Sequence, residues 1–186
     1  MKCTVFVNSL REVTQLLHAH PEVKIVDDPD AFETALAESD AADASQQKGQ
    51  SLGVLHGVPV TVKDALQTKN LKSTGGATEL RENIPSQDAA AVASIRREGA
   101  IVMGKTNLPR WSGDIQAYND IFGTTNNPWD ISRGPGGSSG GAAAAVAMGF
   151  TSFEIGTDIG GSIRFPAAFN GVWGHKPSFG VIPTTG

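Results

Sequence analysis

The sequence has little cysteine and no long apolar run. Cys3 is the only cysteine among 186 residues, which excludes an intrachain disulfide and a cysteine-based zinc site and favours a reducing compartment. No apolar segment approaches the ~20 residues of a membrane span, and the apolar part of the N-terminus is too short for a secretory signal. We therefore expect a soluble, cytoplasmic protein that needs no metal ion or other cofactor.

Clustered positive charge is also lacking. The 15 Lys and Arg residues are scattered along the chain, and the net charge is −4. Domains that bind nucleic acid usually gather basic residues on one face, so we do not expect a nucleic-acid partner. The length is sufficient for one domain with a core that needs no disulfide or structural metal.

Glycine, in contrast, is abundant, and two glycine-rich turns each contain serine. Ser138 lies in the segment G-G-S-S-G-G, and Ser162 ends the segment G-G-S. Glycine tolerates positive φ angles and lets backbone N–H groups approach a ligand closely. A serine in such a turn suits acyl transfer, because the turn offers both a nucleophile and donors for an oxyanion. A flexible linker would not alternate with the apolar segments 142–150 and 165–173.

Helix signals occur at several places. A helix is expected to begin at Pro29, another to be capped by Asp88 and to stop at Gly99, and a third to cover residues 142–148. The capping-box spacing at residues 9–12 predicts a further short helix near the N-terminus. The first of these helices should bury one apolar face, made of Phe32, Ala35 and Leu36.

Strand patterns alternate with these helices. Residues 58–62 alternate between apolar and polar side chains, with Pro59 at the start of the strand or at a sheet edge. Residues 100–104 form a continuous apolar run, and shorter strands are expected at 23–26 and 153–155. The alternation of helices and strands predicts an α/β fold.

Lys63 closes the apolar strand 58–62. From this segment alone we favour a side chain that extends to solvent, with its stem along the apolar surface. A buried lysine would have a different use, because desolvation favours the neutral amine, which can act as a general base.

Residues 99–106, G-A-I-V-M-G-K-T, match the phosphate-loop string letter for letter. In a phosphate loop, the strand precedes the first glycine and a helix opens at the lysine. Here the predicted strand occupies the variable positions and Pro109 follows soon afterwards. Nucleotide binding is therefore not expected.

Asp158 and Arg164 flank the second serine. We favour an ion pair that holds the turn over a direct role of either side chain in the chemistry.

Three segments together resemble the amidase signature family. They are G-V-P-V-T-V-K-D (57–64), P-W-D-I-S-R-G-P-G-G-S-S-G-G (128–141) and G-T-D-I-G-G-S-I-R-F-P-A-A-F (156–169). The resemblance extends over residues 35–186. It implies an α/β fold with a mixed sheet core covered by helices, and a serine hydrolase acting on amides.

The resemblance also implies a Ser–cis-Ser–Lys triad. Ser162 would be the nucleophile, Ser138 the bridging serine after a cis peptide bond, and Lys63 the base. The implied reaction is hydrolysis of a carboxylic amide to a carboxylate and ammonia or an amine, through an acyl-enzyme on Ser162. The implied oxyanion hole is formed by the backbone N–H groups of Ile159, Gly160, Gly161 and Ser162, and the expected supporting residues are Ser139, Asp158 and Arg164.

Some positions depart from the family pattern. Arg110 stands where many members have a carboxylate, Asn170 replaces a common cysteine, and His175 replaces a leucine. These changes leave the triad intact. Residues 1–28 have no clear match, so we expect a divergent N-terminal segment at 1–28 and the N-terminal part of an amidase signature domain at 29–186.

Members of the family are generally much longer than this chain. The missing part would supply further strands, helices and much of the acyl pocket, so we expect the core to be incomplete at its C-terminal side. The expected partners are a small-molecule amide substrate and either a second copy of the chain or a complementary C-terminal chain. The alternative is a catalytically incomplete fragment or an accessory chain.

A second alternative is a G-x-S-x-G hydrolase. Residues 136–140 fit that motif, and Asp158 and His175 follow in the order Ser, Asp, His. This reading leaves Lys63 and the second glycine-serine turn unexplained, so we favour it less.

Overall fold

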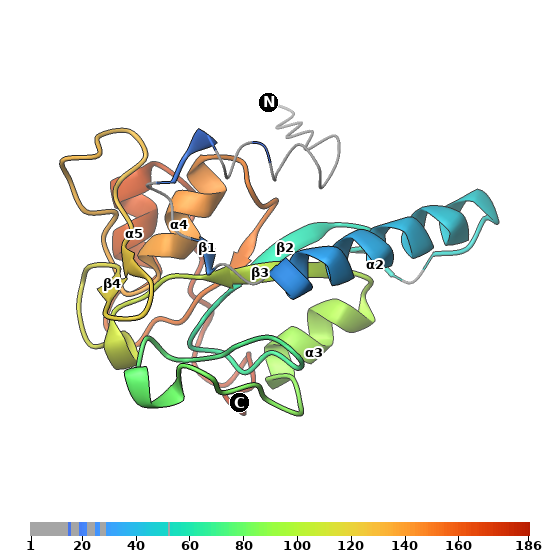
Figure 1. Ribbon diagram of the computed structural model, residues 1–186, viewed down its shortest axis with the longest axis horizontal. Coiled ribbons are helices and arrows are strands. Elements are labelled where there is room, and N and C mark those ends of the chain that lie inside the picture. Colours follow the sequence, from blue (N-terminus) through green and yellow to red (C-terminus); the bar gives the residue numbers. More distant parts are fainter. Residues whose placement is uncertain (1–14, 16–18, 22–24, 27–28, 52) are drawn as a thin grey trace.

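A four-stranded sheet with the strand order β1-β3-β2-β6 lies between the helices of the computed structural model (Figure 1). The model describes residues 15, 19–21, 25–26, 29–51 and 53–186. The strands are β1 (Ile25–Val26), β2 (Pro59–Lys63), β3 (Ile101–Thr106) and β6 (Glu154–Ile155). β3 and β6 run parallel to β2, whereas β1 pairs antiparallel with β3. This mixed sheet confirms the predicted α/β class.

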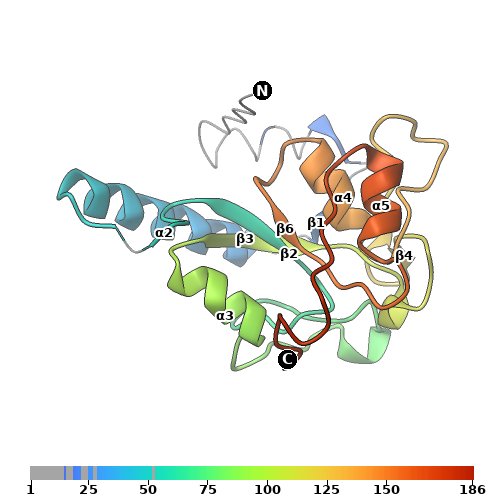
Figure 2. The same cartoon turned by 180° about the vertical axis from the view of Figure 1, so that it is seen from behind.

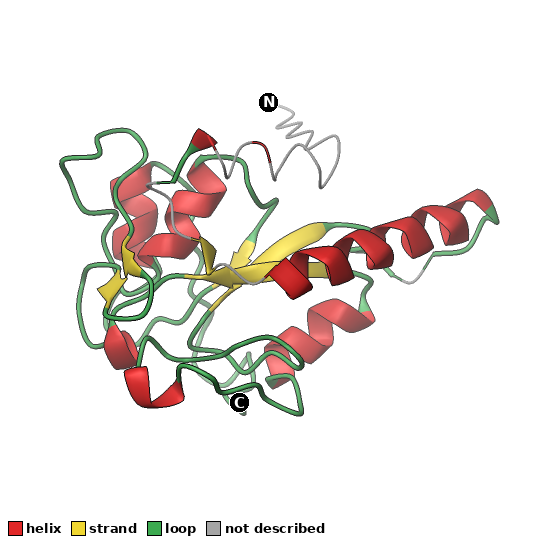
Figure 3. Cartoon of the chain, in the orientation of Figure 1, coloured by secondary structure: helices red, strands yellow, loops and turns green. Residues whose placement is uncertain are grey.

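Helices cover both faces of the sheet, as Figure 3 shows by colour. They are α2 (Pro29–Gln47), α3 (Ala90–Arg97), α4 (Gly140–Ala147) and α5 (Arg164–Asn170). The shorter elements are the 3-10 helices η1 (Thr78–Leu80) and η2 (Arg110–Ser112) and a hairpin of β4 (Tyr118–Asn119) and β5 (Gly123–Thr124). None of the helices in the described ranges is both long enough and apolar enough to cross a bilayer.

Two apolar clusters form the core, one on each side of the sheet. The first joins α2, β3 and α4, and its buried members are Ala35, Ala42, Ile101, Met103, Ala144, Ala145 and Phe150. The second lies mainly between the sheet and α3, and its buried members are Ala31, Val60, Val62, Leu71, Ala89, Val92, Ala100 and Val102. Phe32 and Leu36 pack against the first cluster beside Ala35, which confirms the predicted apolar face of α2.

The central strand β2 begins at Pro59, as predicted, where the missing N–H removes no ladder hydrogen bond. Val60 and Val62 belong to the cluster next to α3. Because successive side chains of a strand point to opposite faces, Thr61 and Lys63 point to the face that carries α4. Because side chains alternate along β2, the Lys63 side chain lies on the face of the sheet that α4 covers.

The start of α3 differs from the prediction. Ala89 is the N-cap residue, and no side chain caps the helix. The expectation that Asp88 caps it was wrong, because the Asp88 carboxylate accepts a hydrogen bond from the Lys69 backbone N–H at 2.7 Å and pairs with Arg96. The short helix predicted after residues 9–12 lies largely outside the described residues.

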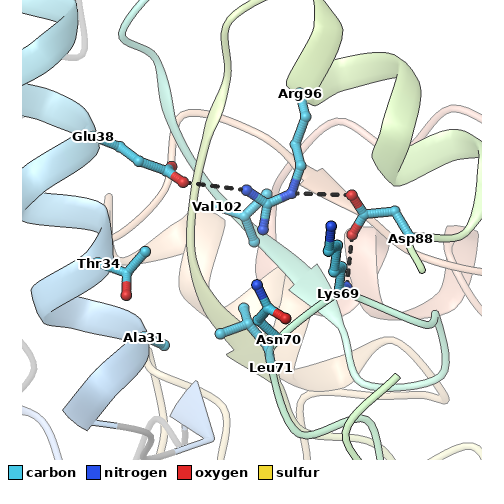
Figure 4. A pocket seen from close by; sticks show the side chains of 9 residues that line it. All are labelled: Ala31, Thr34, Glu38, Lys69, Asn70, Leu71, Asp88, Arg96 and Val102. Carbon is cyan, nitrogen blue, oxygen red and sulfur yellow. Dashed lines mark hydrogen bonds and ion pairs between the residues drawn. The ribbon is translucent and has the colours of Figure 1, made fainter. Parts of the chain in front are cut away.

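A cavity of about 230 Å³ lies between α2, α3 and the segment 69–71 (Figure 4). Arg96 crosses it and lies 3.5 Å from Glu38 of α2 and 3.4 Å from Asp88. Arg96 thus connects α2 to α3 across the cavity through its contact with Glu38. The cavity shares no lining residue with the two glycine-serine turns.

Candidate active site

Lys63 is completely buried at the carboxyl end of β2. Its Nζ atom lies 2.6 Å from Ser138 Oγ and 2.7 Å from Thr157 Oγ1. The expectation from its own segment, a side chain extended to solvent, was therefore wrong. Hydroxyl groups from segments far along the chain enclose the amine, and a reading of β2 alone contains no information about them.

Burial lowers the pKa of Lys63 from 10.5 to about 7, because the charged ammonium form loses its hydration. The negative charges of Glu154 and Asp158 act in the opposite direction but do not outweigh burial. A substantial fraction of the Lys63 side chain is consequently a neutral amine at neutral pH. A neutral amine has a lone pair that can accept a proton.

The turn before α4 presents Ser138 to Lys63. The peptide bond between Gly137 and Ser138 is cis, at the position where the resemblance implies it. A Cβ atom at Gly137 would lie 2.2 Å from the carbonyl oxygen of Gln116. The backbone of the turn therefore lies too close to the segment that contains Gln116 for residue 137 to carry a side chain. Ser138 itself is fully buried.

A main-chain hydrogen bond joins the two glycine-serine turns. The backbone N–H of Ser139 donates to the carbonyl oxygen of Ser162 at 3.0 Å. The hydroxyl of Ser139 lies 3.3 Å from both the nitrogen and the carbonyl oxygen of Thr157. These contacts bring Lys63, Ser138 and the backbone of Ser162 into one region.

Asp158 organises the turn that carries Ser162. Its carboxylate accepts hydrogen bonds from the backbone N–H groups of Gly161 at 2.8 Å and Ile163 at 3.1 Å. The side chain of Arg164 adds two hydrogen bonds of 3.0 Å each. These bonds, led by those from Arg164, hold the pKa of Asp158 well below its usual range. The ion pair that the sequence predicts is present.

The same contacts affect the predicted oxyanion donors. The N–H of Gly161 already donates to the Asp158 carboxylate in this structure. Among the described residues, the N–H groups of Ile159, Gly160 and Ser162 have no hydrogen-bond partner. Three of the four predicted donors thus remain available.

The side chain of Ser162 is half-buried. Its hydroxyl forms no hydrogen bond with Ser138 or with any other residue that the structure describes. The structure therefore shows the contact between Lys63 and Ser138 but not a hydroxyl-to-hydroxyl contact between the two serines.

Sequence reasoning missed Thr157 and Glu154. Thr157 binds the Lys63 amine directly. Glu154 accepts hydrogen bonds from Thr61 and Thr106, and burial raises the pKa of its carboxyl to about 7. A signal was present in the second case, because Glu154 stands between Phe153 and Ile155 in an otherwise apolar strand.

The alternative Ser-Asp-His arrangement has no support in the geometry. His175 is exposed, and no hydrogen bond or ion pair joins it to Asp158 within the described chain. The Asp158 carboxylate is instead engaged by Arg164 and by backbone N–H groups.

The phosphate-loop string forms a strand, as predicted, with Lys105 inside β3. The buried Lys105 amine donates to the Leu66 carbonyl oxygen at 2.7 Å and to Ser73 Oγ at 2.9 Å, and it lies 3.5 Å from Asp64. Burial lowers its pKa to about 8. A lysine enclosed in this way does not present its amine to a phosphate.

Residues 17–186 match the family model described as Amidase, and the chain therefore belongs to the amidase family. The match begins at residue 17 and so includes part of the segment 1–28, for which the sequence motifs had given no clear resemblance to the family. The buried lysine and the two glycine-serine turns described above all lie within the matched residues.

The chain is similar to the A subunit of glutamyl-tRNA(Gln) amidotransferase. It is 44% identical over 154 residues to the protein of Alkaliphilus metalliredigens, covering 83% of this chain and 31% of the relative. It is 46% identical over 156 residues to that of Rhodopirellula baltica, covering 84% and 31%. The chain thus spans about a third of the length of the curated relatives it matches.

Solved structures have the same fold. The peptide amidase from Stenotrophomonas maltophilia has a TM-score of 0.88 and 35% identity, over 95% of this chain and 38% of that one. The A subunit of glutamyl-tRNA(Gln) amidotransferase from Thermotoga maritima has a TM-score of 0.77 and 29% identity, over 95% and 36%. These neighbours confirm the fold expected from the resemblance.

Proposed function

We propose that this chain carries the catalytic groups of an amide hydrolase, which cleaves a carboxylic amide to a carboxylate and ammonia or an amine. The observation that supports it most directly is the buried contact of 2.6 Å between Lys63 Nζ and Ser138 Oγ. A lysine is costly to bury unless its amine is used or well paired. Membership of the amidase family points to the same chemistry.

In the proposed mechanism, neutral Lys63 accepts the proton of the Ser138 hydroxyl. Ser138 in turn accepts the proton of Ser162, whose oxygen attacks the carbonyl carbon of the amide. The Ser162 hydroxyl reaches Ser138 by rotation about its Cα–Cβ bond when substrate binds, since catalytic hydrogen bonds are often unformed in the absence of a ligand. Thr157 accepts an N–H of Lys63, which leaves the amine lone pair directed toward Ser138.

Attack by Ser162 forms a tetrahedral intermediate with a negatively charged oxygen. The N–H groups of Ile159, Gly160 and Ser162 are the proposed donors to that oxygen, and loss of one such donor typically costs about 3–4 kcal/mol of transition-state stabilisation. Asp158, through its bond to the N–H of Gly161, fixes the shape of the turn. The proton then passes back through Ser138 to the leaving amine, and water hydrolyses the acyl-enzyme.

We propose a small-molecule amide as the substrate and a complementary C-terminal segment or chain as the partner. The chain matches only about a third of its relatives' length, and those relatives are named as subunits of an amidotransferase. The single cysteine supports a reducing compartment, which we take to be the cytoplasm.

A fluorophosphonate probe should test the identity of the nucleophile. The probe is expected to form a bond from Ser162 Oγ to phosphorus with release of fluoride. This reaction requires an activated hydroxyl and hydrogen-bond donors to the phosphoryl oxygen, so labelling identifies the nucleophile. Mass spectrometry of the digested protein should place the adduct on Ser162. Ser152→Ala, at an exposed serine outside the site, should keep the label and Ser162→Ala should lose it, whereas an adduct on Ser138 or Ser139 would contradict the proposal.

Turnover should rise with pH as one group loses its proton near pH 7. The reason is that burial lowers the pKa of Lys63 to about 7 and only the neutral amine accepts a proton, so activity is lost below that pH and retained above it. The measurement is kcat/KM for a small amide as a function of pH, with the chain assembled with its complementary C-terminal portion. In Lys63→Arg the rising limb should vanish along with activity, since the guanidinium stays protonated. A wild-type rate independent of pH between 5 and 9 would be the contrary result.

A further inference from the structure

Glu154 lies in the short strand β6, opposite Thr61 in the register of β2 and β6. Its carboxylate accepts a hydrogen bond from the Thr61 hydroxyl and another from Thr106 Oγ1, the latter at 2.6 Å. Each carboxylate oxygen therefore has one threonine partner, and the two partners come from different strands. A carboxylate held from β2 and β3 at once has a fixed position beside the sheet.

Both threonines are neighbours of Lys63. Thr61 precedes Lys63 by two residues and so shares its face of β2, and Thr106 is the register partner of Lys63 on β3. The carboxylate of Glu154 is therefore anchored on the same face of the sheet as the Lys63 amine. Two residues bind that amine: Thr157, which follows β6, and Ser138, which precedes α4.

Other charged groups near Lys63 are already compensated or lie elsewhere. Helix α4 contributes only glycine, alanine and valine to this face. Asp158, the second carboxylate that acts on Lys63, is paired with Arg164. Lys105 points to the opposite face, where Asp64 is its nearest carboxylate. Glu154 is thus the carboxylate anchored on the face of Lys63, and its charge acts on Lys105 as well as on Lys63.

We propose that Glu154 is a positioning residue for Lys63: its anchored negative charge sets the pH at which Lys63 becomes a neutral amine. This inference rests on the proposed role of Lys63 as the base. Among the charges that favour protonated Lys63, that of Glu154 acts most strongly and partly offsets burial. Burial raises the pKa of Glu154 itself to about 7, so the two groups change protonation in the same pH range and respond to one another.

The test replaces Glu154 by glutamine, which keeps the shape and a hydrogen-bond acceptor but removes the charge. The titration of Lys63 is followed by NMR of the chain, labelled with 13C at lysine Cε and assembled with its complementary C-terminal portion. The Lys63 signal is assigned by its loss in Lys63→Met. Without the negative charge, protonated Lys63 is less stable, so its titration midpoint should fall by about one pH unit. Glu79→Gln, at an exposed carboxylate paired with Arg110, is the matched control and should leave the midpoint unchanged.

Thr106→Val provides a second variant if Glu154→Gln folds poorly. Loss of that hydrogen bond makes ionised Glu154 less favourable, so the Lys63 midpoint should fall in the same direction by a smaller amount. The Lys105 signal should move in the same direction in both variants, because the charge of Glu154 also favours protonated Lys105.

An unchanged Lys63 midpoint in both Glu154→Gln and Thr106→Val would overturn the inference. A wild-type Lys63 midpoint near the ordinary lysine value of about 10.4 would instead contradict its proposed role as base. In that case a lower Lys63 midpoint in Glu154→Gln would still support the link between the two residues. Failure of the positioning role of Glu154 and failure of the role of Lys63 as base therefore give different results.

Discussion

Replacement of Ser162, Ser138 or Lys63 by alanine is expected to lower amide hydrolysis by several orders of magnitude, with each single change nearly as damaging as the triple change. The reason is that the three groups pass one proton, and removal of any member interrupts the whole transfer. The measurement is kcat/KM of the chain assembled with its complementary C-terminal portion. Residual hydrolysis should reflect the oxyanion donors alone.

His175→Ala is the informative control for this series. His175 is exposed and makes no contact with Asp158 among the described residues, so its loss should leave kcat/KM nearly unchanged. The Ser-Asp-His alternative predicts the reverse order of effects. If His175→Ala abolishes turnover while Lys63→Ala preserves it, the assignment of the base is wrong.

The 186-residue chain made alone is expected to be marginally stable, to self-associate and to have little or no amidase activity. In the sheet that the described residues form, β6 lies at one edge and has only two residues, and exposed sheet edges pair readily with other chains. The segment after α5 runs across the molecule to the start of α3, where the Ala90 N–H donates to the Thr185 carbonyl oxygen (Figure 2). Along it, large apolar side chains are exposed: Trp173, Phe179, Val181 and Ile182.

Exposed apolar surface of this extent marks either an interface or an aggregation hazard. Ile159, one of the proposed oxyanion donors, also has a fully exposed side chain. Sedimentation of the isolated chain tests whether it self-associates, and thermal unfolding tests whether it is marginally stable. Addition of a C-terminal piece should restore activity. A monodisperse monomer with a cooperative transition and full turnover would show that the chain is complete as an enzyme.

Local signals in the sequence were sufficient for much of the fold. Pro29 marks the start of α2, Pro59 the start of β2, and Gly99, with a φ of 92°, the end of α3. Each position depends on a backbone constraint of the residue itself, which needs no knowledge of the neighbours. The three motif segments brought the site residues together through the family resemblance rather than through any local rule.

The environment of the lysine was not predictable in this way. Burial of Lys63 depends on Ser138 and Thr157, which lie far along the chain, and a local reading therefore favoured solvent. Asp88 was predicted to cap α3 because the sequence does not show that its carboxylate binds the Lys69 N–H, 19 residues away, and Arg96 of the same helix. The hydrogen bond from the Gly161 N–H to Asp158 was likewise not predictable from the sequence, because it depends on the shape of the folded turn.

The two buried lysines link folding of this chain to proton release. Burial lowers the pKa of Lys63 to about 7 and that of Lys105 to about 8, whereas lysines of an unfolded chain titrate near 10.4. Between roughly pH 7 and 10 the unfolded chain binds more protons, so these lysines make the free energy of unfolding rise with pH. Glu154, whose pKa burial raises from 4.5 to about 7, has the opposite effect below neutrality. The contribution of these groups to stability is therefore lowest near neutral pH, where Lys63 would begin to act as a base.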